Sequence, residues 1–243
     1  MEVVKTELIA IKKKYAEDRR SNVMVGGKEM DIESVEKELK QIDDFAVGFT
    51  YGKMFKKMTE RNFKSSDKEV KENSNVEDFI KFVAHAKSNQ TLLAFTNLGN
   101  CCKIDMEIAP ESRYRDKGHK FSDVCKDTAR NEYPVAFFAV DEEKLPDGHL
   151  LFFTKDGLIK KTEWSEYNLL KPYYQAIKLK DCNELIRVEE DRAETTIAFI
   201  TEKGQALNAL KDDIPVQGRV AGGGKGMDGA DGDYVVYAGL IED

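Results

Sequence analysis

The chain of 243 residues has few of the features that mark a membrane, secreted or metal-binding protein. No apolar run approaches the roughly 18 residues that a membrane-spanning helix needs, and the N-terminus has no apolar core of a secretory signal. The 4 cysteines include no Cys-x-x-Cys pair, and the 3 histidines have no partner at metal-ligand spacing. These absences predict a cytoplasmic protein with reduced thiols, no bound metal and no membrane partner.

Catalytic signatures are equally scarce. The glycine-rich stretch at 222–226 does not fit a Walker A loop, because Arg219 stands in place of the first glycine and Gly226 in place of Ser or Thr. Residues 224–229 fit G-x-G-x-x-G, but no helical pattern follows them and no acidic ribose-binding residue can follow at the required distance. We therefore expect a turned connection between strands there, no catalytic residues and no cofactor. Backbone N–H groups of this stretch, with Arg219 and Lys225, would also suit a nucleic-acid phosphate.

A short phrase recurs four times, each time between two strand-like apolar runs. Its copies are Phe49-Thr50-Tyr51-Gly52, Phe95-Thr96-Asn97-Leu98-Gly99, Phe153-Thr154-Lys155-Asp156-Gly157 and Ile200-Thr201-Glu202-Lys203-Gly204. Aromatic and β-branched residues suit strands, and a glycine tolerates the positive φ of a tight turn. A repeat of about 50 residues is typical of propellers and repeat arrays. The pattern predicts an all-β, propeller-like domain of about four blades.

A change from helical to strand-like patterns near residue 45 predicts the domain boundary. Apolar residues at 4, 8, 11 and 15 predict a helix over 2–20, and residues 33–42 form either a second short helix or a linker. Strand patterns begin at Phe45, so we predict a helical tail and linker at 1–44 and the β domain at 45–243. The charged stretch 60–90 is expected to be an exposed connection or a divergent part of the first repeat. The adjacent Cys101 and Cys102, in a strand, should point to opposite faces.

The net charge of −7 argues mildly against nucleic acid as a partner, so any basic surface must come from the arrangement of side chains. Only residues 45–92 are net basic, with 9 Lys and Arg against 6 Asp and Glu. Basic residues follow the turns, and a second cluster surrounds Ser112 and Gly118. The candidate phosphate-binding residues are Lys53, Lys56, Lys57, Lys103, Arg113, Arg115, Lys117, Lys120, Lys160, Lys161, Arg219 and Lys225.

Several segments, in this order and spacing, resemble a known family. They are residues 7–20, the runs Leu92-Leu93-Ala94-Phe95-Thr96-Asn97-Leu98-Gly99 and Leu151-Phe152-Phe153-Thr154-Lys155-Asp156-Gly157, and the segment Gly218-Arg219-Val220-Ala221 followed by Gly224-Lys225-Gly226. Together they are similar to the C-terminal domain of the A subunit of bacterial type IIA topoisomerases, gyrase and topoisomerase IV. The resemblance covers nearly the whole chain.

This resemblance implies a β-pinwheel, in which blades exchange strands and duplex DNA bends along a basic rim. It implies that residues 1–44 end the breakage–reunion region, that the catalytic tyrosine lies upstream of residue 1, and that the domain itself is not an enzyme. The implied partners are duplex DNA and, in an ATP-dependent topoisomerase, the ATPase B subunit together with the catalytic region of the A subunit.

The chain departs from the family in two respects. The glutamine–arginine–glycine box of the gyrases is absent, because the corresponding stretch reads Arg61-Asn62-Phe63-Lys64-Ser65-Ser66-Asp67-Lys68. Four repeats are visible, whereas the family usually has five or six.

Two other classes of function stay open. The negative charge favours a propeller-like protein-interaction module that binds no nucleic acid. An enzyme built around residues 222–226 is a third possibility, for which thermal stabilisation by nucleotides would be the signature.

Overall fold

The computed structural model describes residues 2–15, 42–72, 78–193, 196–229 and 232–241. The chain divides into two units, residues 1–41 and 42–243. In the first unit, helix α1 (Glu2–Tyr15) forms where the apolar spacing predicts a helix. The rest of that predicted helix, 16–20, and the predicted helix or linker up to residue 41 lie outside the described residues. None of the helices that the structure describes is long and apolar enough to cross a membrane.

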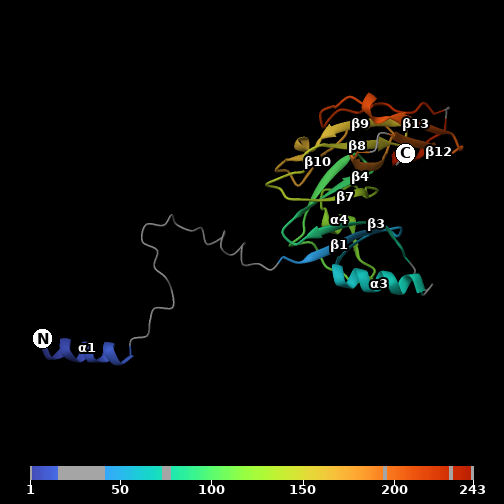
Figure 1. Cartoon of the computed structure of the whole chain (residues 1–243). Coiled ribbons are helices and arrows are strands. Elements are labelled where there is room, and N and C mark those ends of the chain that lie inside the picture. The colour runs from blue at the N-terminus through green and yellow to red at the C-terminus, as the bar shows by residue number, and fades with distance from the viewer. Residues whose placement is uncertain (1, 16–41, 73–77, 194–195, 230–231, 242–243) are drawn as a thin grey trace. The chain divides into compact units, whose positions relative to one another are not determined.

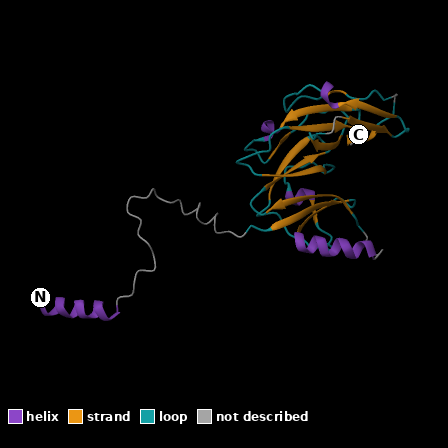
Figure 2. Cartoon of the chain, in the orientation of Figure 1, coloured by secondary structure: helices purple, strands orange, loops and turns teal. Residues whose placement is uncertain are grey.

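The second unit contains four antiparallel sheets, called blades 1 to 4 in chain order (Figures 1 and 2). Each blade is centred on a hairpin that contains one copy of the repeated phrase. The hairpins are β1–β2 (Asp44–Thr50, Met54–Thr59), β4–β5 (Thr91–Thr96, Asn100–Asp105), β8–β9 (His149–Thr154, Leu158–Glu163) and β12–β13 (Thr196–Thr201, Ala206–Leu210). The predicted all-β, propeller-like fold of about four blades is confirmed.

Each hairpin has an inner strand on the side of its first strand. These inner strands are β3 (Ile80–Lys87) beside β1, β7 (Pro134–Val140) beside β4, β11 (Leu185–Glu190) beside β8, and β15 (Val235–Ile241) beside β12. Inner strands of consecutive blades contact one another, β3 with β7, β7 with β11 and β11 with β15. The blades therefore follow one another with their hairpins facing outward.

The outer edge of each of the first three blades is completed by a strand from later in the chain. These returning strands are β6 (His119–Lys120) on β2, β10 (Tyr173–Gln175) on β5, and β14 (Gly224–Lys225) on β9. Each follows the hairpin of the next blade in the sequence. The chain therefore returns to the previous blade before it forms the inner strand of the next one. We call residues 111–120, 168–180 and 216–226 the returning segments. Among the described residues, β13 of blade 4 has no such outer partner.

The core consists of three apolar clusters, one between each pair of consecutive blades. Strand β4 shows why its sequence reads as one apolar run. Leu92 and Ala94 pack into the first cluster, whereas Leu93 and Phe95 pack into the second. Because side chains alternate between the two faces of a strand, a blade that is covered on both sides must be apolar at every position.

The repeated phrase forms the same turn in every blade. The hydroxyl oxygen of its threonine accepts the main-chain N–H four residues later, at 3.1, 3.2, 3.0 and 3.1 Å for Thr50, Thr96, Thr154 and Thr201. Gly99, Gly157 and Gly204 have φ between 78° and 85°. In blade 1 the position of positive φ belongs to Lys53, at 62°. The prediction that Gly52 takes this role is wrong, because the residue of positive φ lies three positions after the threonine in every blade and Gly52 lies only two after Thr50.

Two further expectations are corrected. Of the two alternatives for residues 60–90, the exposed connection is wrong and the divergent part of the first repeat agrees with the structure, because they contain helix α3 (Glu60–Glu72) and inner strand β3 of blade 1. Helix α3 occupies the place in the first repeat where later repeats have a returning strand. In its described residues the second unit also contains the short helices α4 (Phe121–Val124), η1 (Trp164–Tyr167) and η2 (Lys211–Asp213).

The thiols are not all reduced. Cys102 and Cys125 form a disulfide with their Cα atoms 6.4 Å apart, and Cys101 and Cys182 are free. The sequence separation of 23 between Cys102 and Cys125 conceals this proximity. Cys101 and Cys102 do point to opposite faces, since they pack into different core clusters.

Candidate nucleic-acid interface

Three of the twelve candidate cations, Lys56, Lys57 and Lys160, are buried, at 4%, 2% and 0% exposure. Their ammonium groups donate to main-chain carbonyls. The acceptors are Tyr114 O at 2.8 Å for Lys56, Met106 O at 2.7 Å and Ala109 O at 3.2 Å for Lys57, and Ala176 O at 2.8 Å and Arg219 O at 2.6 Å for Lys160.

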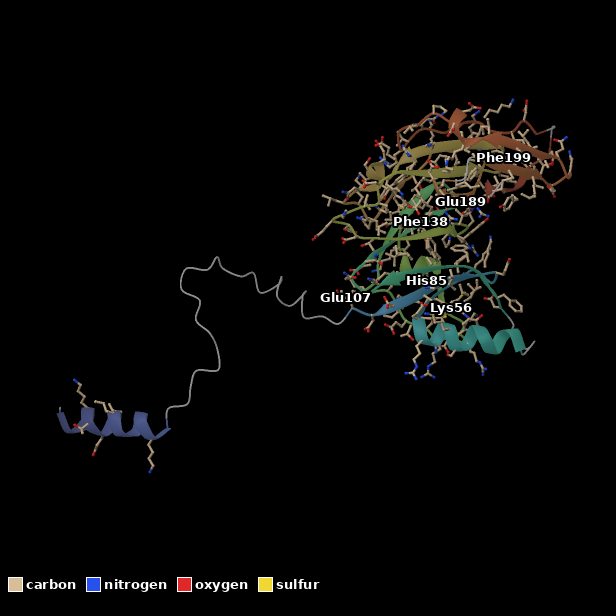
Figure 3. The ribbon with its side chains drawn as sticks, in the orientation of Figure 1. Lys56, His85, Glu107, Phe138, Glu189 and Phe199 are labelled. Atoms are coloured by element: carbon tan, nitrogen blue, oxygen red, sulfur yellow. A yellow bond between two sulfur atoms is a disulfide. The ribbon has the colours of Figure 1, made fainter. Side chains whose placement is uncertain are left out.

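Two of these buried lysines, Lys56 and Lys160, hold returning segments against the hairpins. Lys56 and Lys160 occupy the same position of the β2 and β9 hairpin strands, and their acceptors Tyr114 and Arg219 belong to the segments that cross back over those strands. Burial lowers the pKa of Lys56, and nearby Asp78 and Asp116 only partly oppose this effect. Burial also lowers the pKa of Lys160 to about 7, with the charge of Arg219 acting in the same direction. Figure 3 marks Lys56 in blade 1, whose β2 strand contacts α3.

Lys103 and Lys161 are half-buried and bound to acidic partners. The Lys103 ammonium lies 2.8 Å from Glu142 and donates to the Leu169 carbonyl at 2.9 Å. The Lys161 ammonium lies 2.8 Å from Asp191. Their side chains are 12% and 15% exposed, so they present little charge to solvent. Together with the three buried lysines, we leave them out of the interface.

The other seven candidates lie at the surface, Arg219 half-buried and the rest exposed. Four of them, Arg113, Arg115, Lys117 and Lys120, belong to the first returning segment. Lys53 lies at the tip of the β1–β2 hairpin, and its neighbour Met54 pairs with Lys120. Five candidates are thus brought together at the outer edge of blade 1.

Helix α3 adds two cations that the sequence analysis missed. The Asn62 side-chain oxygen accepts the Tyr114 N–H at 3.1 Å, and the Phe63 ring lies 6.3 Å from the Tyr114 ring. The helix therefore packs on the first returning segment and places exposed Arg61 and Lys64 beside it. We call the combined set the blade 1 basic surface: Lys53, Arg61, Lys64, Arg113, Arg115, Lys117 and Lys120. In the sequence, only the i, i+3 spacing of Arg61 and Lys64 indicated that these two cations could lie on one face of a helix.

Two carboxylates at this surface are engaged locally. Glu60 lies 3.1 Å from the Lys64 ammonium and 3.0 Å from His85 Nδ1. Burial would raise the pKa of Glu60, but the hydrogen bonds from Lys64 and His85 outweigh it and hold that pKa below its ordinary value. Asp116 accepts the main-chain N–H of Arg113 at 2.8 Å. An acidic chain thus keeps an excess of exposed cations on this surface.

The other two returning segments also carry exposed cations. In the second they are Lys171, Lys178 and Lys180, which the sequence analysis did not single out because they surround an apolar Tyr173-Tyr174 pair and not a turn. In the third, the Arg219 guanidinium donates to the Gln175 carbonyl and lies 5.6 Å from the Tyr174 ring centroid. The Lys225 ammonium pairs with Asp228 at 2.6 Å. The outer edges of three consecutive blades therefore bear cations, most densely at blade 1.

The glycine-rich stretch has a structural explanation. Gly224 begins the returning strand β14, and Gly223 before it has φ of 89°. A Cβ atom at residue 223 would lie 2.7 Å from the Ile159 carbonyl oxygen, so only glycine lets the segment approach β9. Within the described residues, no group of three or more His, Cys, Asp or Glu side chains is placed to hold a metal ion.

The family model and the relatives that match this chain agree on one family. Residues 148–189 and 195–242 match the family model of the DNA gyrase C-terminal domain, beta-propeller. The A subunit of DNA topoisomerase 4 from Bacillus subtilis is 30% identical over 249 aligned positions, covering 100% of this chain and 30% of the relative. The A subunit of DNA gyrase from Streptococcus pyogenes serotype M3 is 28% identical, covering 90% of this chain and 27% of the relative. The chain thus spans less than a third of these relatives.

Solved structures agree. The C-terminal domain of a DNA topoisomerase IV superposes with a TM-score of 0.70 at 25% identity, covering 84% of this chain and 63% of that one. The E. coli ParC C-terminal domain superposes with a TM-score of 0.62 at 14% identity, covering 82% of this chain and 80% of that one. The second likeness shows the fold alone.

Proposed function

Because this chain belongs to the family of the C-terminal domains of the A subunits of DNA gyrase and topoisomerase IV, we propose that it binds duplex DNA along the outer edges of blades 1 to 3 and bends it. The supporting observation is the position of its exposed cations. In a chain of net charge −7, exposed lysines and arginines lie on all three returning segments and on α3, which packs against the first.

The chemistry of this surface suits phosphates more than bases. Lysine and arginine side chains that neutralise phosphates release condensed counterions, which gives affinity without reading sequence. The cations follow successive blade edges, so DNA that contacts more than one edge must change direction. Preference among sequences should then follow the ease of bending.

The wider role follows from the relatives, which are the A subunits of topoisomerases. In this proposal the domain presents DNA to the catalytic region of such a subunit, in a cytoplasmic ATP-dependent topoisomerase that also contains an ATPase B subunit. Residues 1–44 would be the end of the breakage–reunion region and its linker. DNA cleavage would be carried out by that catalytic region and not by this chain.

Fluorescence anisotropy with a labelled duplex, measured over a series of salt concentrations, tests the proposal. The Lys117→Ala/Lys120→Ala double variant should bind roughly tenfold more weakly, and its log–log salt slope should be shallower by about 1.8, or 0.9 per lost phosphate contact. Lys144→Ala is the control, because Lys144 is exposed in the turn after β7 and belongs to none of the returning segments. It should bind like the wild type.

Absence of binding at low salt would contradict the proposal and favour a protein-interaction module. Equal losses of affinity per charge removed in the control and the double variant would show that only net charge matters, and would contradict an interface on the returning segments.

A further inference from the structure

The hairpin turn of each blade is bonded to the residue that precedes the inner strand of the same blade. In all four blades the residue after the repeated threonine donates its main-chain N–H to the carbonyl of that residue. The pairs are Tyr51–Phe79 at 2.9 Å, Asn97–Tyr133 at 3.0 Å, Lys155–Glu184 at 2.8 Å and Glu202–Tyr234 at 2.8 Å. Of these four pairs, only that of blade 1 is aromatic at both positions. We call Tyr51 and Phe79 the aromatic pair.

The two side chains of the aromatic pair lie opposite each other at the surface. Strands β1 and β3, side by side in Figure 1, are paired up to Thr50 and Ile80, and Tyr51 and Phe79 lie one step further toward the turn. Residues directly opposite on antiparallel strands direct their side chains to the same face, with Cβ atoms about 5 Å apart. Tyr51 is 70% exposed and Phe79 is 51% exposed. Neither ring belongs to the three core clusters.

Hydrogen bonds fix the main chain beneath the aromatic pair. Besides the bond between Tyr51 and Phe79, the Gly52 N–H donates to the Asp78 carboxylate at 2.8 Å. This bond also turns the neighbouring carboxylate toward the main chain. The rings thus stand on an ordered turn, so a ligand that stacks on them need not order the backbone first.

Cations of the blade 1 basic surface lie beside the aromatic pair. Lys53 belongs to the same turn, and Lys120 of the first returning segment lies opposite Met54. Burial lowers the pKa of Lys56, which this segment covers, and the charge of Asp78 partly opposes that effect. Asp78, the residue before Phe79, therefore lies within electrostatic reach of the place where the segment crosses β2. The tip of blade 1 combines exposed rings with exposed positive charge.

We propose that the aromatic pair stacks on unpaired nucleobases of DNA, while Lys53 and Lys120 contact the adjoining phosphates. In a paired duplex the faces of the bases are covered by neighbouring bases, whereas a base in a locally opened strand offers its face to a protein ring. Exposed aromatic rings combined with cations are how proteins bind single strands without reading their sequence. The inference rests on the proposed DNA binding, and adds to it a stretch of opened DNA at blade 1.

Fluorescence anisotropy with two labelled DNAs tests the proposal: a fully paired duplex, and the same duplex with a central bubble of unpaired thymines. The wild type should bind the bubble DNA more tightly. The Tyr51→Ala/Phe79→Ala double variant should bind the bubble DNA at least about fivefold more weakly than the wild type, as the loss of stacking on one base predicts. Its affinity for the paired duplex should stay close to that of the wild type.

Tyr234→Ala is the matched control. Tyr234 is an aromatic residue, 39% exposed, at the position in blade 4 that corresponds to Phe79, but it is bonded to Glu202 and not to a second aromatic residue. This variant should prefer the bubble DNA as strongly as the wild type does.

Two single variants separate stacking from general apolar contact. Tyr51→Phe keeps the flat ring and should bind the bubble DNA like the wild type. Tyr51→Leu keeps an apolar side chain without a flat face and should bind it more weakly. Ultraviolet crosslinking with iodouracil in the bubble should attach the DNA to Tyr51 or Phe79, which mass spectrometry of the peptides can identify.

The outcomes distinguish this inference from the proposed function. A wild type that binds both DNAs equally well overturns the inference but not duplex binding. A preference for the bubble DNA that survives in Tyr51→Ala/Phe79→Ala, or that is unchanged in Tyr51→Leu, overturns stacking on the aromatic pair. Absence of binding to both DNAs contradicts the proposed function, and this inference with it.

Discussion

The Lys160 ammonium donates a hydrogen bond to the Arg219 carbonyl at 2.6 Å, which joins the β9 strand to the segment that crosses back over it. Lys56 makes the equivalent bond to Tyr114 in blade 1. In blade 2 this position is Cys102, whose disulfide joins β5 to Cys125 at the end of α4 and not to the segment that completes this edge. In blade 4 it is the exposed Leu207. The residue at this one position of the repeat, and the bond that it makes, thus differ between blades.

The buried Lys160 should make stability depend on pH. Its pKa falls from 10.5 to about 7 on folding, because burial disfavours the charge. Between these values the unfolded chain binds more protons, so the contribution of Lys160 to stability is least near pH 7 and below, and rises as the pH rises toward 10.5. Urea unfolding should show the wild type gaining roughly 1 kcal/mol per pH unit over Lys160→Met in this window. Lys225→Met, at an exposed position, is the control, and a constant difference for Lys160→Met would refute the argument.

Asp191 should matter most at neutral pH. Burial opposes its ionisation, but contacts with the Lys161 and Lys211 ammonium groups, both at 2.8 Å, outweigh burial and hold the pKa of Asp191 below its ordinary value. Its stabilisation is therefore present above the ordinary carboxyl pKa and is lost as the pH falls through the lowered one. Asp191→Asn should cost about 1–3 kcal/mol at pH 7 and less in acid, by urea unfolding. Asp212→Asn, at an exposed site, should change the unfolding free energy little. Equal losses of unfolding free energy at the two sites would contradict the special role of Asp191.

The threonine of the repeated phrase should be needed for its hydroxyl. Thr154 is fully buried, and its oxygen accepts the Leu158 N–H at 3.0 Å. Thr154→Val keeps the shape but leaves that N–H without a partner, which should cost about 1–3 kcal/mol in chemical denaturation. Thr154→Ser keeps the acceptor and should lose less, mainly for the missing methyl group. A serine variant as unstable as the valine variant would show that packing decides.

The disulfide should stabilise the β domain. It joins β5 to the end of α4 across a sequence separation of 23, which reduces the conformational entropy of the unfolded chain. Reductant should lower the unfolding free energy by about 2–4 kcal/mol. A Cys102→Ala/Cys125→Ala variant should unfold identically with and without reductant. If reductant destabilises that variant as much as the wild type, the effect does not come from this bond.

The hairpins were predictable because their signals are local. Thr154 and Gly157 lie within one turn, and the runs on either side are apolar at every position. Helix α3 was missed because its few apolar residues stand among many charges. The Cys102–Cys125 bond was missed because pairing depends on where distant segments meet.

The sequence by itself determined the four blades, since turn chemistry and strand patterning act over a few neighbouring residues. Only the tertiary structure decided which cations face solvent. Lys160 and Lys225 look alike in sequence, but one is fully buried and the other is 61% exposed. The physical reason is that the chain crosses back over a strand formed much earlier. The segment that covers Lys160 begins more than 50 residues later, and the spacing of residues in the sequence does not indicate that contact.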